Sequence, residues 1–88
     1  MEKTTNTKDL TREEILTTSL TAREQEVMHY QINIDNYTLA LEEISKLSSE
    51  ESTEMSAFAN QLVELLASEK LEQKKAKIML AVVKKQIQ

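Results

Sequence analysis

The chain has 88 residues, enough for one domain, and a formal net charge of −4 at pH 7. It contains no glycine, proline or cysteine, which excludes disulfides, thiolate metal sites and phosphate-binding glycine loops. Tight β-hairpins usually need residues at positive φ, so this composition disfavours a sheet-rich fold. Ala, Leu, Glu, Lys and Gln are plentiful, and we therefore expect an all-α protein.

The first nine residues are polar and show no hydrophobic periodicity. We expect residues 1–9 to form a disordered arm, followed by a single helical-hairpin domain over residues 10–88. The start has no apolar signal segment, and no run approaches the roughly 20 apolar residues that span a bilayer. These features predict a soluble, cytoplasmic protein without membrane contact.

Two helix-start signals lie close together at the beginning of the domain. The pairs Thr11–Glu14 and Thr21–Glu24 both fit a capping box. Either a short leading helix ends near Ser19 and a second helix follows, or one helix continues through both signals to residue 47. The two caps favour a break or kink between them, whereas the apolar spacing favours continuity, and we prefer the break.

The stretch from residue 22 to residue 47 has a heptad pattern. Its apolar residues recur at alternating steps of three and four, which is typical of a helix packed along another helix. The series is Val27, Tyr30, Ile34, Tyr37, Leu41 and Ile44. Leu16 and Leu20 extend it backwards, with Arg23 as the one charged interruption. A thinner apolar stripe, Met28, Ile32 and Leu39, lies on nearly the opposite side.

A turn is predicted at residues 48–54, where Ser48 or Ser49 can cap a helix that begins near Glu50 and continues to the end. This helix also has two apolar stripes. The main stripe comprises Met55, Phe58, Leu62, Leu65, Leu66, Ala76, Leu80, Val83 and Ile87, interrupted by Glu69 and Gln73. The minor stripe comprises Ala67, Leu71, Ile78 and Val82.

Folding the two long helices back on each other at Ser48 gives a long antiparallel helical hairpin with coiled-coil-like packing. In this register the polar interruptions of the two helices coincide. The expected neighbours are Leu41 with Phe58, Tyr37 with Leu62, Ile34 with Leu65, and Arg23 with Glu69 and Glu72.

The minor stripes are left without a partner in a single hairpin. Exposed apolar surface of this kind usually marks an interface. We therefore predict a homodimer or higher bundle, with another protein as a further possible partner. The predicted interface residues are Met28, Ile32, Leu39, Leu71, Ile78 and Val82.

A single Glu-x-x-His pattern, Glu26 with His29, is the spacing used in di-metal helical bundles. Such sites need the pattern twice, and a symmetric dimer would supply the second copy, with Asp35 or Glu42 as extra ligands. Since the pattern occurs once, we interpret His29 as a surface or interface residue. No serine sits beside His29 in a triad arrangement. The sequence predicts no catalytic, metal or cofactor site, and hence no enzyme.

The charge is unevenly distributed along the chain. Residues 1–69 contain five basic and fourteen acidic side chains, whereas residues 70–88 contain six basic and one acidic. Lys70, Lys74, Lys77 and Lys84 share one broad side of the last helix and are a possible anion contact. A small regulator that touches nucleic acid through this end is the alternative function, although the acidic remainder argues against nucleic acid as a partner.

The segment from Leu20 to Val27, LTAREQEV, resembles the first helix of LuxR-type helix-turn-helix domains. That family continues with a glycine-containing turn and a recognition helix, whereas this chain continues with unbroken heptads, so DNA binding is not carried over. In general character the chain resembles small accessory proteins of bacteriophages. The leading prediction is a non-enzymatic protein for protein–protein interaction or oligomerisation.

Overall fold

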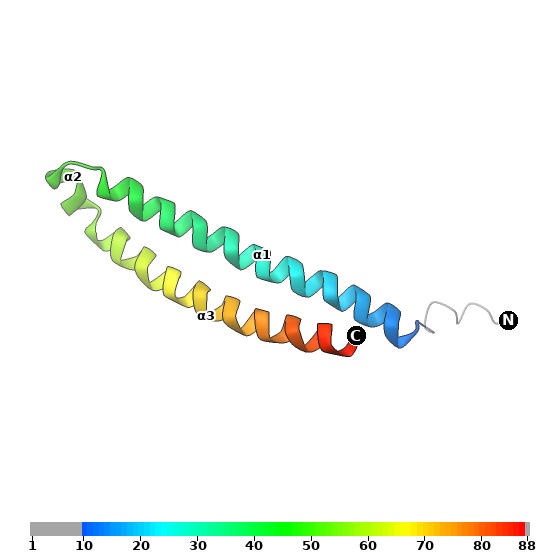
Figure 1. Cartoon of the computed structure of the whole chain (residues 1–88). Coiled ribbons are helices and arrows are strands. Elements are labelled where there is room, and N and C mark those ends of the chain that lie inside the picture. The colour runs from blue at the N-terminus through cyan, green and yellow to red at the C-terminus, as the bar shows by residue number, and fades with distance from the viewer. Residues whose placement is uncertain (1–9, 88) are drawn as a thin grey trace.

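The protein is a two-helix hairpin in its computed structural model, which describes residues 10–87. The helices are α1 (Arg12–Ser45), α2 (Ser49–Glu54) and α3 (Ser56–Ile87). Figure 1 shows α1 and α3 side by side and antiparallel, joined through α2 at one end. No strand occurs within the described range, and the predicted all-α hairpin is confirmed. The predicted N-terminal arm, residues 1–9, lies outside the described residues.

A capping box starts α1, as predicted. The Thr11 hydroxyl oxygen accepts a hydrogen bond from the Glu14 backbone N–H at 3.1 Å, and the Thr11 N–H donates to Glu14 Oε1 at 2.8 Å. Two backbone donors that have no partner inside the helix are thereby satisfied, which stabilises this end.

The preferred break near Ser19 is wrong, because α1 runs without interruption from Arg12 to Ser45. The Thr21 hydroxyl does not cap a new helix: it donates to the Thr17 carbonyl at 3.3 Å, one turn back. A threonine bonded in this way fits a helix interior. Leu16 and Leu20 are partly buried on the extended helix, so continuity removes apolar surface from water that a break would expose.

The turn is built around Ser48, whose hydroxyl oxygen accepts from the Glu51 N–H at 3.3 Å and so caps α2, as predicted. The single helix predicted from Glu50 to the end is wrong, because Met55, with φ −94° and ψ 5°, separates α2 from α3. The Met55 N–H donates to both Glu51 O and Ser52 O at 3.1 Å. The bond to Ser52 O spans three residues, as in a 3₁₀-helix, and tightens the last turn of α2. Helix α3 then starts in a new direction.

A thin seam joins α1 and α3. Its buried apolar residues are Ile34, Leu62, Ala76 and Val83, and no large side chain within the described range is fully buried. On α1 the seam follows the predicted heptads, with Val27, Tyr30, Tyr37, Leu41 and Ile44 partly buried.

On α3 the predicted main stripe is confirmed at Leu62, Leu66, Ala76, Leu80 and Val83, which are buried or partly buried, and is wrong at the exposed residues Met55, Phe58, Leu65 and Ile87. The seam passes through Ala59, Leu62, Leu66, Glu69, Gln73, Ala76, Leu80 and Val83, again at steps of three and four. Phe58 and Leu65, predicted to face Leu41 and Ile34, are instead 48% and 39% exposed. Each of these two residues lies one position before a seam residue, Ala59 or Leu66, so the heptad spacing turns it out of the seam.

Candidate interaction surfaces

A polar layer crosses the middle of the seam. Gln73 is only 8% exposed, and its Nε2 donates to Gln31 Oε1 at 2.9 Å and to the Val27 carbonyl at 3.3 Å. One turn nearer the bend, Asn33 Nδ2 donates to Glu69 Oε1 at 2.6 Å. Polar pairs inside a seam favour the register in which both members are satisfied. We therefore expect this layer to favour the observed alignment of α1 and α3.

Arg23 does not join this layer across the seam. Its Nη1 pairs at 3.2 Å with Glu26 Oε1, one turn along α1, and both side chains are more than one third exposed. The predicted contact of Arg23 with Glu69 and Glu72 is thus replaced by a contact within α1. The reason is proximity, since residues three apart on a helix are neighbours.

All six residues predicted from the sequence as an interface lie exposed on the hairpin. On α1 they form what we name the α1 patch, which comprises Met28, Ile32 and Leu39 at 59%, 50% and 56% exposure. On α3 they are Leu71, Ile78 and Val82 at 54%, 63% and 42%. The two sets lie on different helices, and each consists of side chains that the seam leaves in water.

The surface on α3 is wider than predicted. Phe58, Leu65 and Met79 are also exposed, and each lies one residue before a seam position, namely Ala59, Leu66 and Leu80. Together with Leu71, Ile78 and Val82 they form one apolar side of the helix, which we name the α3 patch. The sequence contains the signal for this wider surface. When Glu69 and Gln73 are counted as seam positions, the heptad spacing places Phe58 and Leu65 outside the seam.

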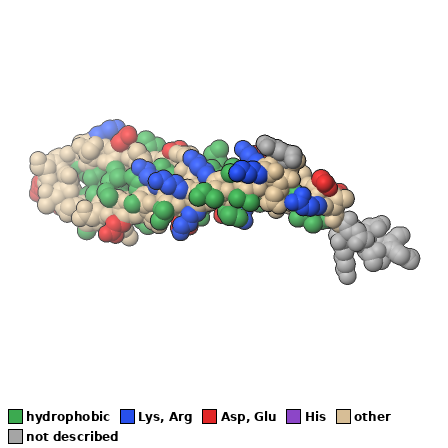
Figure 2. Space-filling view, turned by 60° about the horizontal axis from the view of Figure 1, so that its bottom comes forward, with side chains coloured by type: hydrophobic (Ala, Val, Ile, Leu, Met, Phe, Trp, Pro, Cys, Tyr) green, Lys and Arg blue, Asp and Glu red, His purple; other side chains and the backbone are tan. Residues whose placement is uncertain are grey.

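The lysines singled out from the sequence lie on the other side of α3. Lys70, Lys77 and Lys84 each directly follow a seam residue, and Lys74 falls between them on the same side. All four are exposed. In Figure 2 Lys and Arg side chains lie along the molecule, with hydrophobic side chains between them. We name Lys70, Lys74, Lys77 and Lys84 the lysine row.

Glu26 and His29 are not brought together with further ligands. Glu26 binds Arg23, and the exposed His29 ring lies edge-on to Tyr30, with the ring centres 6.3 Å apart. Over residues 10–87 no three His, Asp or Glu side chains are grouped closely enough to hold a metal ion.

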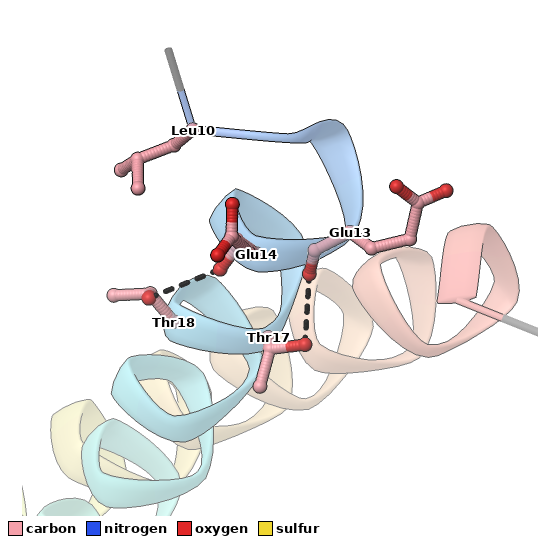
Figure 3. Close-up of a pocket in the computed structure, with 5 residues that line it drawn as sticks. All are labelled: Leu10, Glu13, Glu14, Thr17 and Thr18. Carbon is pink, nitrogen blue, oxygen red and sulfur yellow. Dashed lines mark hydrogen bonds between the residues drawn. The ribbon is translucent and has the colours of Figure 1, made fainter. Parts of the chain in front are cut away.

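One surface pocket lies at the start of α1 and is lined by Leu10, Glu13, Glu14, Thr17 and Thr18 (Figure 3). The Thr17 hydroxyl donates to the Glu13 carbonyl at 2.8 Å, and the Thr18 hydroxyl donates to the Glu14 carbonyl at 3.1 Å. Both hydroxyl donors are thus engaged within α1. Every lining residue comes from one short stretch of chain, so the pocket lacks the convergent polar groups of a ligand site.

No described helix combines the length and the apolar character needed to cross a membrane. Comparison of the chain with family models, curated proteins and solved structures gives no match.

Proposed function

We propose that the protein is a non-enzymatic helical interaction protein, which assembles with itself into a dimer or larger bundle. The α1 patch and the α3 patch are its contact surfaces. A patch that self-assembly leaves uncovered is the site for another protein. The general resemblance to bacteriophage accessory proteins adds no residue to this proposal.

The observation that carries the proposal is the imbalance between buried and exposed apolar residues. Among residues 10–87 only four apolar residues are buried, whereas Ile32, Leu39, Leu71 and Ile78 are each at least half exposed. A two-helix pair of this size removes little apolar surface from water. Chains this short usually need assembly, a disulfide or a bound metal ion to be stable. Packing the patches against a second helical pair supplies the missing burial.

Light scattering coupled to size exclusion tests the self-assembly. At micromolar concentration we expect a mass of at least twice that of one chain. Changing Ile32 and Leu39 to glutamate should weaken the binding of another protein at the α1 patch, while far-UV circular dichroism stays helical. A wild-type protein that is monomeric at this concentration would contradict the self-assembly.

A second candidate function is contact with an anionic polymer through the lysine row. Its support is the exposure of Lys70, Lys74, Lys77 and Lys84 on one side of α3. Contacts between lysines and phosphates weaken steeply with salt, because bound counterions are released. If this function holds, duplex DNA or RNA binding at low salt should fall when Lys70, Lys74 and Lys77 are changed to glutamine. Unchanged binding would show that the row is not the contact.

A further inference from the structure

We propose that a second copy of the chain docks on the α3 patch with its own α3 antiparallel, and that the two-fold axis passes near Glu72. This inference rests on the proposed self-assembly and specifies which surface is used and in which orientation. The α1 patch then stays open on both outer faces of the dimer.

The outward surface of α3 is divided into two unlike sides. Phe58, Leu65 and Met79 precede seam residues, whereas Lys70, Lys77 and Lys84 follow them, so the two sets flank the seam on opposite edges of the helix. Leu71, Ile78 and Val82 complete the apolar side. A like helix can bury the apolar side while the ammonium groups of Lys70, Lys77 and Lys84 stay in water, which avoids the cost of desolvating them.

A contact between α3 and α1 shows on which side of the hairpin the α3 patch lies. Arg12 Nη2 donates to Gln86 Oε1 at 3.1 Å. Gln86 lies seven residues after Met79, so it belongs to the row of α3 that precedes the seam. Arg12 lies seven residues before Ser19, which directly precedes the seam residue Leu20, so Arg12 belongs to the corresponding row of α1. The rows that precede the seam on the two helices therefore share one side of the hairpin. On α1 this row contains Arg12, Ser19, Glu26, Asn33 and Ala40, and the exposure of Phe58, Leu65 and Met79 shows that it leaves the α3 patch accessible.

Two residues of the α3 patch are placed symmetrically about the middle of the helix. Leu65 and Met79 lie seven residues before and after Glu72, or about 10 Å on either side at about 1.5 Å per residue. An antiparallel copy therefore brings Leu65 against Met79 twice. The two-fold axis brings the two Glu72 carboxylates together at the centre, and the Lys75 ammonium of each copy, 3.1 Å from its own Glu72, offsets the repulsion between them.

Charge selects the antiparallel orientation. The half of the hairpin next to the turn, residues 27–69, contains one basic and eight acidic side chains. The other half, residues 10–26 and 70–87, contains eight basic and five acidic side chains. A parallel dimer sets the acidic halves against each other, whereas an antiparallel dimer sets each acidic half against a basic one.

Single cysteines measure the orientation without interference, because the native chain has none. Three exposed polar positions on this side of α3 serve: Gln61→Cys toward the turn, Ser68→Cys near the axis and Gln86→Cys toward the open end. In the antiparallel dimer two copies of Gln61 are about 33 Å apart along the helix, and two copies of Ser68 about 12 Å apart. A short bis-maleimide bridges the second separation and not the first.

We expect Ser68→Cys to cross-link with itself, and Gln61→Cys to cross-link with Gln86→Cys after the two variants are mixed and re-equilibrated. Neither Gln61→Cys nor Gln86→Cys alone should give a covalent dimer. Efficient self-cross-linking of Gln61→Cys means a parallel dimer and overturns the inference. A dimer by light scattering in which no variant cross-links means another interface, and this also overturns the inference while self-assembly stands.

A matched pair of substitutions tests the surface independently. Leu65→Glu places a charge in the α3 patch, and Val63→Glu places the same charge two residues away on the lysine side, where Val63 is 54% exposed. We expect Leu65→Glu to raise the dimer dissociation constant at least tenfold and Val63→Glu to change it less than twofold. Equal effects overturn the inference, and a monomeric wild-type chain removes the proposed self-assembly as well.

Discussion

The side-chain amide of Gln73 donates to the side-chain oxygen of Gln31 at 2.9 Å, across the seam between α3 and α1. It places a polar group in the small interior of the hairpin, where Gln73 is 8% exposed. A polar residue at such a position fixes alignment at the expense of stability.

Replacing Gln73 by leucine should therefore stabilise the hairpin, by about 1 kcal/mol. The Gln31 side chain is only partly buried and can turn to water, so the change leaves no buried polar group unpaired. Thermal unfolding followed by circular dichroism at fixed protein concentration measures the effect. Gln73→Ala is the control and should destabilise, since it removes both the hydrogen bonds and the packing. A lower melting temperature for Gln73→Leu would contradict the packing described for Gln73.

The capping box predicts a difference between two nearby threonines. Thr11→Ala removes the oxygen that accepts from the Glu14 N–H and should lower the free energy of unfolding by about 1 kcal/mol. Thr18→Ala removes a hydroxyl that bonds to the Glu14 carbonyl inside the helix. This second change should be neutral or stabilising, since alanine is the better helix former. Equal losses in urea denaturation would show that Thr11 does not act as the cap.

The phase of α3 is tested by two adjacent residues. Leu62 is 4% exposed and Val63 is 54% exposed. Leu62→Ala should reduce the free energy of unfolding by about 3 kcal/mol, because it leaves a cavity in the seam. Val63→Ala should have an effect of less than about 0.5 kcal/mol, as is usual for surface changes. A large effect of Val63→Ala would place the seam one residue out of phase.

The continuity of α1 is tested by proline at residue 22. If a second helix began just after Thr21, Ala22 would be its first residue, where proline is favoured. Inside a continuous α1 the same substitution removes a backbone hydrogen bond and clashes with the preceding turn, at about 3 kcal/mol or more. We expect Ala22→Pro to cause a marked loss of helicity and of thermal stability. If this variant were as stable as the wild-type protein, the result would support a break between two helices near Thr21.

The sequence was sufficient to predict features that depend on neighbours along the chain or on strict periodicity. These are the caps at Thr11 and Ser48, the heptads from Val27 to Ile44 and the antiparallel hairpin itself. The capping pattern at Thr21 misled, because the same residue types also occur inside a helix, where the hydroxyl bonds one turn back. Local chemistry alone does not distinguish these two uses of threonine.

The burial of Gln73 and the outward position of Phe58 and Leu65 escaped prediction for a different reason. Glu69 and Gln73 read as interruptions of an apolar stripe, yet Gln73 is buried because Gln31, 42 residues away, satisfies its amide. A partner so distant in sequence is not visible in a spacing pattern. Phe58 and Leu65 are assigned to the seam by their apolar character, although each lies one residue before a seam position, on the outer surface of α3.

The absence of any fully buried large side chain over residues 10–87 has a thermodynamic consequence. If the chain gains its missing burial from a copy of itself, folding and association become a single equilibrium governed by mass action. The midpoint of heat denaturation must then climb as the sample is concentrated, and dilution alone must melt the helices. For such a chain a single melting temperature has meaning only together with the concentration at which it was recorded.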